Sequence, residues 1–128
     1  MEAQKQLEEL LEADVAILSK QNLTKVDLAK TNLTWVNLEG TLLRLANFRE
    51  ATLKRANLRL AILEGADLSG AVLCGCKIYK TNFNEAFLVK AIINQAKIEE
   101  SFFSDTNFKE AQLMNTQFHN CVFEKGKL

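Results

Sequence analysis

Few residues in this sequence have the side chains and spacing that catalysis requires. His119 is the single histidine, so it has no second histidine as a metal-ligating or proton-transfer partner. Cys74, Cys76 and Cys121 lack the spacing of a zinc site. The carboxylates are scattered, with no acid and base pair, and no glycine-rich phosphate loop is present. The sequence therefore predicts no catalytic residue, metal, cofactor or enzymatic activity.

A five-residue period in the sequence determines where all other residues lie. Every fifth position from Leu18 to Leu128 is leucine, isoleucine or phenylalanine, without a break. A step of five turns an α-helix by about 140° and alternates between the two faces of a strand, so neither element would bury this row. A fixed repeat instead predicts a solenoid, in which each unit buries its apolar side chain against neighbouring units.

Two further rows follow the same period. The residue two before each large apolar residue is small, usually alanine, except at Gln21. The residue directly before it is often Asn or Asp, whose side chains hydrogen-bond nearby backbone and favour turns. Segments such as Ala46–Glu50, Ala56–Leu60 and Ala66–Gly70 resemble the A-(D/N)-L-x-x unit of the pentapeptide repeat family. The resemblance implies an all-β solenoid, a right-handed quadrilateral β-helix with one pentapeptide on each of four faces per coil.

The first residues differ from the repeat. Leu7, Leu10 and Leu11 follow helical spacing among good helix formers, and the segment is acidic. We predict one domain, with a short N-terminal capping α-helix at residues 1–15 and a β-helix of about 5.5 coils at residues 16–128. A helix over the first coil would cover strand edges and core side chains. A helix that binds a partner is the alternative.

Three features indicate the compartment. Residues 1–15 have neither the basic n-region nor the apolar run of a signal peptide, and no stretch has the length of a membrane span. Cys76 and Cys121 fall in the small inward row, whereas Cys74 points outward, so a bond between Cys74 and Cys76 would cross the wall of the coil. Cysteines without disulfide or metal spacing favour a reducing compartment. We predict a cytoplasmic protein without membrane contact.

The C-terminal end continues the repeat to Leu128, with no helix or polar cap after it. Phenylalanines are concentrated in this part, and Phe83, Phe103 and Phe123 fall on one face, where we expect their rings to stack. An apolar end that exposes strand edges predicts a homodimer through the last coil, with Phe118, Phe123 and Leu128 at the interface. The family resemblance also implies dimers at this end. A monomer with a frayed last coil is the alternative.

Function must then reside in outward positions. Several positions have an apolar residue where the repeat usually has Asn or Asp. These are Leu42, Ile62, Phe102 and Val122 on one face, Val72 and Ile92 on the opposite face, and Phe87 on a third, with Leu45 near Leu42. Exposed apolar rows mark interaction sites in some proteins and are ladders that stabilise coil stacking in others. We predict a partner protein of unknown identity, with the stacking role as the alternative.

The basic residues form a belt in the sequence. Arg44, Arg49, Lys54 and Arg59 occupy the same outward position on four successive faces, and Arg55 joins them. These side chains point in different directions and cannot grip one duplex together, so we predict no nucleic-acid partner. We expect partial pairing with carboxylates on the neighbouring coils, namely Glu39 for Arg59 and Glu64 for Arg44.

Net charge separates two classes of function. Some pentapeptide repeat proteins mimic B-DNA and inhibit DNA gyrase, which confers quinolone resistance, and such a mimic needs a strongly anionic surface. This chain has a net charge of zero, and residues 16–128 have 15 Lys and Arg against 11 Asp and Glu, a net of +4. The leading prediction is therefore a non-enzymatic structural or protein-interaction module, and a gyrase inhibitor is the alternative.

Overall fold

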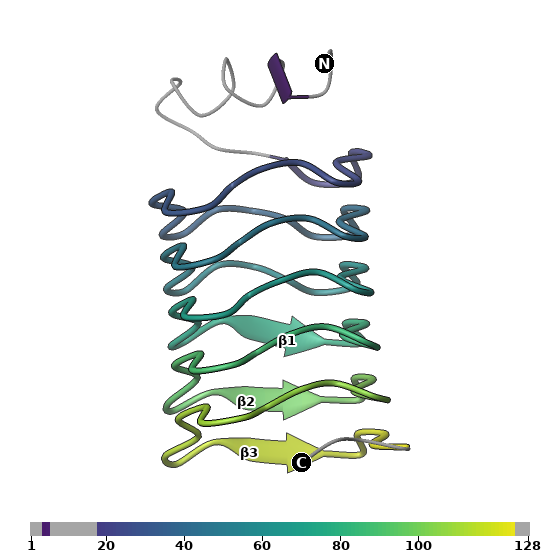
Figure 1. Cartoon of the computed structure of the whole chain (residues 1–128). Coiled ribbons are helices and arrows are strands. Elements are labelled where there is room, and N and C mark those ends of the chain that lie inside the picture. Colours follow the sequence, from purple (N-terminus) through teal and green to yellow (C-terminus); the bar gives the residue numbers. More distant parts are fainter. Residues whose placement is uncertain (1–3, 6–17, 125–128) are drawn as a thin grey trace.

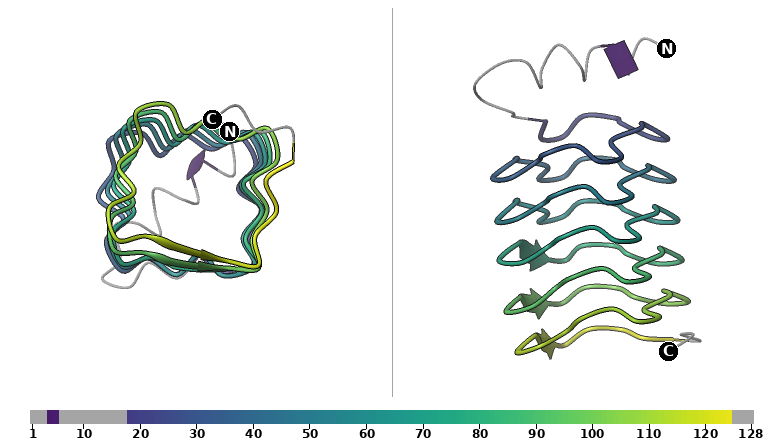
Figure 2. Two further views of the ribbon diagram at one scale, coloured as in Figure 1. Left: turned by 90° about the horizontal axis from the view of Figure 1, so that it is seen from below. Right: turned by 60° about the vertical axis from the view of Figure 1, so that its left-hand side comes forward.

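The computed structural model describes residues 4–5 and 18–124. From residue 18 onward the chain winds into a stack of similar coils, with the first coil at one end and the last at the other (Figure 1). Viewed along the stack, the coils superimpose as a four-sided outline (Figure 2). This shape confirms the all-β solenoid that the five-residue period predicts.

Successive coils pair in a constant parallel register. Each isolated bridge joins a residue to the one 20 positions later, from Asn22 with Leu42 to Phe102 with Val122. One coil therefore contains four five-residue units, one for each face. This register confirms which residues share a face, because every fourth unit of the sequence returns to the same side.

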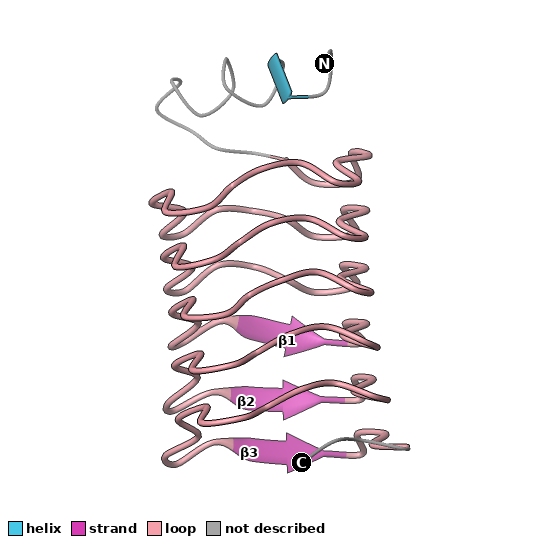
Figure 3. Cartoon of the chain, in the orientation of Figure 1, coloured by secondary structure: helices cyan, strands magenta, loops and turns pink. Residues whose placement is uncertain are grey.

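One face contains the regular strands. β1 (Lys77–Tyr79), β2 (Lys97–Glu99) and β3 (Gln117–His119) form a parallel sheet in the order β1-β2-β3 (Figure 3). Ile78 lies opposite Ile98, which lies opposite Phe118. The other described coils have shorter extended stretches, since turns at the corners interrupt them after each unit.

The backbone of each coil is hydrogen-bonded to both neighbouring coils. The N–H of Leu43, a large inward residue, donates to the carbonyl of Ile62 in the next coil at 2.8 Å. The N–H of Leu42 donates to the carbonyl of Gln21 in the preceding coil at 2.9 Å. This alternation recurs along the stack, so a coil satisfies its peptide groups only when coils lie on both sides of it.

The two inward rows fill the interior. Alanines of the small row and the large apolar residues are almost completely buried as far as Phe103. The Phe83 and Phe103 rings stack at 5.0 Å between centroids, and Phe103 and Phe123 stack at 5.2 Å, which confirms the predicted ladder. Phe108 and Phe118 pack against Phe103 in tilted and edge-on orientations, so the last coils have an aromatic core.

Hydroxyl groups in the small row have a second role that the sequence pattern does not reveal. The hydroxyls of Thr81 and Thr106 donate to the carbonyls of Leu58 and Phe83 in the preceding coil, each at 2.7 Å. Every buried side-chain polar atom of the described residues has a partner. Threonine at this position therefore fills space and also adds a bond between coils.

The corners place one residue of every unit in the left-handed region. The residue two after each large apolar residue has φ near +60° along the described stack, including Trp35, Leu45 and Glu85. Only glycine adopts this conformation without steric cost, and Gly75 is one of four glycines at corners. Most corners therefore have a strained backbone that the bonds between coils maintain.

The predicted capping helix at residues 1–15 lies outside the described residues except for Gln4 and Lys5, which are helical. The Gln4 side-chain amide forms a pair of hydrogen bonds with the backbone of Asp27. Its Nε2 donates to the Asp27 carbonyl at 3.0 Å, and its Oε1 accepts from the Asp27 N–H at 2.9 Å. Gln4 thus occupies the edge of the first coil as a preceding coil would.

The corner strain predicts a gain in stability from glycine. Glu85 is exposed and has φ of 61°, so Glu85→Gly relieves about 1–2 kcal/mol of left-handed strain and loses about 0.5–1 kcal/mol in chain entropy. We expect the free energy of unfolding in urea to rise by up to about 1.5 kcal/mol. The matched change is Gly75→Ala, where φ is +72° and the added Cβ meets Arg55 Cγ at 3.2 Å. Gly75→Ala should destabilise the protein, and an increase in its stability would contradict the claim that the corners are strained.

Candidate functional site

The outward apolar row has the geometry that the sequence predicts. Leu42 bridges Ile62, and Phe102 bridges Val122, all on one face, with Asn82 between the two pairs. Leu42 and Phe102 are 37% and 42% exposed, and Ile62 and Val122 are half-buried. The row is therefore a surface ladder with accessible apolar side chains at two levels.

Most of the other predicted apolar residues lie on other faces than this row. Val72 bridges Ile92 on the opposite face, and both are half-buried. Leu45 is a corner residue, 54% exposed, and a Cβ added at Gly65 in the next coil would meet its Cδ2 at 2.7 Å. Phe87 stands on a third face and is 47% exposed. Val72, Ile92 and Phe87 therefore lie on other faces than the row, whereas Leu45 lies at a corner of the row's own face.

The last described coil exposes part of the aromatic core. Phe123 and Leu113 are exposed although they occupy the large inward row, and Phe118 is only partly buried. Met114, at the same end, is 69% exposed. Leu128 of the predicted dimer end lies outside the described residues. The described end of the stack therefore exposes several apolar side chains.

The basic belt divides into a paired and an unpaired half. Arg44 contacts Glu64 at 2.9 Å, as expected, and Arg49 contacts Asp67 at 3.0 Å. Lys54, Arg55 and Arg59 form no ion pair with another described residue, so the expected pair of Arg59 with its neighbour Glu39 is absent. Positive charge therefore remains unneutralised on one side of the stack.

Asp67 is the carboxylate most clearly tuned by its surroundings. Partial burial raises its pKa, but hydrogen bonds from Ser69 and Arg49 outweigh that effect, so the net pKa is lowered. Asp67, Arg49 and Phe87 line a shallow hollow of about 600 Å³ on their face. The carboxylate is an acceptor within an ion pair, which is a structural role.

A second hollow lies on the face of β1 and β2. It has a volume of about 500 Å³, and its charged lining residues are Glu39, Arg59, Lys77, Lys97 and Glu99. Tyr79 forms part of the wall, and the Lys80 ammonium lies 5.3 Å from its ring centroid. The apolar rows and the basic belt of the sequence do not reveal this site. Its signal was a pair of lysines, 20 residues apart, at the position usually taken by Asn or Asp.

A sequence comparison identifies the family of this chain. The family model described as "Pentapeptide repeats" matches the sequence with 8 copies of the repeat, at residues 16–40, 27–65, 63–95 and 88–124. The chain belongs to the pentapeptide repeat family. No curated protein matches it in sequence.

Several solved structures are similar to this pentapeptide repeat protein. A pentapeptide repeat protein of the Arabidopsis thaliana thylakoid lumen is 29% identical over 73% of this chain, with a TM-score of 0.44, and this chain spans 62% of its length. A pentapeptide repeat protein from the cyanobacterium Cyanothece is 23% identical to this chain, with a TM-score of 0.47. The similarity covers 94% of this chain and 99% of that protein. QnrB1, a plasmid-mediated fluoroquinolone resistance protein, is 15% identical over 85% of this chain and 68% of its own, also with a TM-score of 0.47.

The cysteines of this pentapeptide repeat protein are all free thiols. Cys76 is buried, and its Sγ donates to the carbonyl of Leu53 in the preceding coil at 2.8 Å. Cys121 makes a longer contact of the same kind with Ile98, at 3.6 Å. The inward cysteines thus act like the inward threonines, as small residues that also bond between coils.

The remaining polar residues form no reactive group within the part of the chain that the structure describes. His119 is exposed, and its Nε2 lies 3.3 Å from Gln117 Oε1. No group of three His, Cys, Asp or Glu side chains among residues 4–5 and 18–124 is placed to hold a metal. No helix in the same residues has the length and apolarity needed to cross a membrane.

The environment of Cys76 predicts low reactivity and a pH effect. Burial raises its pKa from 9.0 to about 12, so the folded protein retains the thiol proton where an unfolded chain loses it. Stability should therefore fall as the pH rises from 9 towards 12, and it should fall less steeply in Cys76→Ala. With iodoacetamide in native buffer, mass spectrometry should show Cys74 modified before Cys76. Equal rates for the two thiols would contradict the buried position of Cys76.

Proposed function

We propose that this chain is a non-enzymatic module that binds a partner protein through the row of Leu42, Ile62, Phe102 and Val122. The observation that supports the proposal is the exposure of Leu42 and Phe102 at positions where the repeat usually has Asn or Asp. An Asn at this position satisfies a neighbouring backbone N–H, so its loss gives up a local bond. The apolar side chain gains little burial from its own coil, and a partner surface would bury the rest.

The partner surface that fits this face is itself an apolar strip. Neighbouring coils lie about 4.8 Å apart, and the exposed Leu42 and Phe102 lie on one line, three coils apart. Leu60, 49% exposed at the adjoining corner, widens the row at its middle. The row is narrow and uncharged, so a partner helix or strand with one apolar edge is the expected shape.

The charge distribution favours this function over a mimic of DNA. A mimic would present continuous negative charge. Here Arg44 and Arg49 are neutralised, whereas Lys54, Arg55 and Arg59 are not paired with a described residue. Glu85, Asp105 and Glu124, on the face of Leu42, also form no ion pair with another described residue, but they are too few for the continuous negative charge that a mimic of DNA needs.

The proposal extends to the whole chain. We propose a right-handed coil, since parallel crossover connections almost always have that hand. We also propose that residues 1–15 form a helix that caps the first coil, which the pair of hydrogen bonds between Gln4 and Asp27 supports. A cytoplasmic location would fit the free thiols.

The partner proposal predicts the result of a capture experiment with surface variants. In Leu42→Asn with Ile62→Asn, each residue is replaced by the usual one for its position, so the fold should be retained while the row becomes polar. We expect affinity capture from host lysate, followed by mass spectrometry, to lose at least one specific partner about tenfold or more. Val72→Asn with Ile92→Asn makes the same apolar-to-Asn change on the opposite face and should retain the partner. Equal recovery with both variants would contradict the proposal.

We further propose that the end of the stack at Leu113, Phe118 and Phe123 binds a second copy of the chain. Parallel β3 has a described neighbour on one edge only, and the exposed aromatic core adds apolar area. In a dimer with twofold symmetry, the free edge of β3 and the exposed aromatic core would each contact the same surface of the second copy.

The dimer proposal predicts a change of mass in solution. Phe123→Asp should convert a dimer to a monomer in light scattering, because it places an unpaired charge in the contact. Phe87→Asp, at an exposed phenylalanine on a side face, should leave the mass unchanged. A wild-type protein that remains monomeric at high concentration would overturn the dimer.

A further inference from the structure

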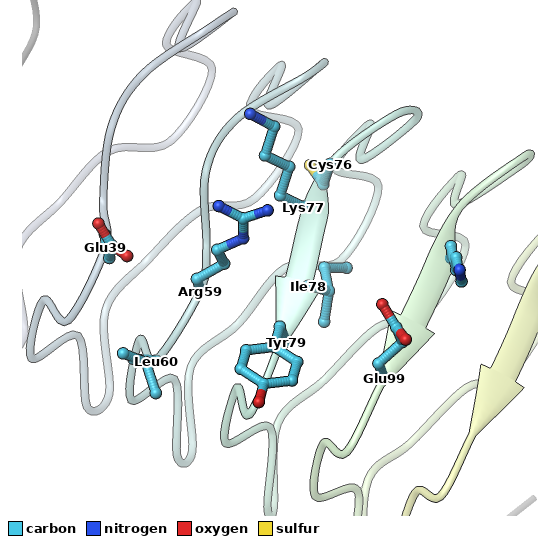
Figure 4. Close-up of a pocket in the computed structure, with 9 residues that line it drawn as sticks. Glu39, Arg59, Leu60, Cys76, Lys77, Ile78, Tyr79 and Glu99 are labelled. Carbon is cyan, nitrogen blue, oxygen red and sulfur yellow. The ribbon is translucent and has the colours of Figure 1, made fainter.

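The hollow on the face of β1 and β2 has a chemistry that the apolar row lacks. Arg59, Lys77, Tyr79 and Glu99 stand on neighbouring coils around it, with Glu39 at its far side (Figure 4). Three cationic side chains and two carboxylates line a volume of about 500 Å³. The surface is therefore concave and polar, and its balance of charge is positive.

The two lysines of the hollow repel each other. Lys77 and Lys97 are directly opposite each other in β1 and β2, about 4.8 Å apart in the backbone. Like charges in such a position destabilise a sheet. Both are exposed, and neither forms an ion pair with another described residue. An anion between the two ammonium groups would remove this repulsion.

Backbone N–H groups at the same place have lost their usual acceptor. On earlier coils of this face, Asn37 Oδ1 accepts the N–H of Glu39 at 3.0 Å, and Asn57 Oδ1 accepts that of Arg59 at 3.1 Å. These bonds show that the N–H points outward, towards the side chain two residues earlier.

Lys77 and Lys97 replace asparagine in the next two coils, and a lysine has no oxygen to offer. No described side chain accepts the N–H of Tyr79 or of Glu99. Two outward N–H donors and two ammonium groups therefore surround the place where asparagine oxygens would lie.

We propose that this hollow binds a compact oxyanion of the phosphate class. Its oxygens would take the place of the missing asparagine oxygens on the N–H groups of Tyr79 and Glu99. The ammonium groups of Lys77 and Lys97 would bridge it, with the Arg59 guanidinium on one side. Charge-assisted bonds from several converging donors are the usual basis of phosphate recognition.

The carboxylates limit the size of the ligand. Glu39 and Glu99 flank the donors along the stack, so an extended polyanion would meet negative charge on both sides. A single phosphate group fits between them, whether it belongs to a free small molecule or to a phosphorylated side chain of a partner. The site does not depend on the apolar row and would exist without it.

Titration followed by amide NMR tests the site directly. Inorganic phosphate and a phosphoserine peptide serve as the two probes, and the unphosphorylated peptide is the blank. We expect saturable shifts of the Tyr79 and Glu99 amides with a phosphate-bearing probe and none with the blank. Saturation by inorganic phosphate indicates a small-molecule source, and saturation by the peptide alone indicates a partner. Saturation by neither probe overturns the proposal.

Lys77→Asn and Lys97→Asn are the informative variants. Each variant restores the asparagine found on the earlier coils. Its side-chain oxygen should accept the hydrogen bond of the backbone N–H, and the coil should remain folded. Each should weaken phosphate binding about tenfold or more, whereas Glu99→Gln should strengthen it. Lys109→Asn makes the same charge change on another face and should leave binding unchanged. If Lys109→Asn weakens binding as much as Lys77→Asn, the effect is one of net charge and the site is overturned.

Discussion

The hydrogen bonds between successive coils are the constraint on which the rest of this structure depends. Each coil donates N–H groups both forward and backward, as Leu43 and Leu42 do. A peptide group in the wall therefore has a partner only if the neighbouring coil is in register. One inserted residue would move every later side chain to a different position and leave these groups unpaired, at a cost of about 1–3 kcal/mol for each buried group. This explains why the repeat runs without insertion and why inward residues vary so little.

The same constraint explains why the strained corners persist. Left-handed φ at Trp35, Leu45 or Glu85 is unfavourable for each residue alone. The corner closes with a hydrogen bond between successive units, such as that from the Ala46 N–H to the Leu43 carbonyl at 3.1 Å. Bonds to the coils on both sides then fix the same residues again. Corner strain is thus distributed over a network that no single residue controls.

How much of this could be predicted from the sequence depends on whether a feature repeats. The faces, the inward rows and the stacking of Phe83 with Phe103 follow from the period, because one register determines them all. For the hollow on β1 and β2, the period places Lys77 opposite Lys97 but does not show which of the basic residues remain unpaired. This depends on which cations find a carboxylate within reach, and Arg44 does so whereas Arg59 does not. Such pairing depends on side-chain rotamers, which the repeat does not specify.

The position before each large apolar residue links the surfaces of this protein. An Asn or Asp there bonds its own backbone and makes the coil self-sufficient, as Asn57 does with Arg59. An apolar residue such as Leu42 leaves that N–H without this acceptor and adds a contact for an apolar surface. A lysine such as Lys77 leaves it equally free and adds positive charge. The uniform backbone therefore presents the same donor in each case, and the side chain beside it decides what kind of ligand that donor can bind.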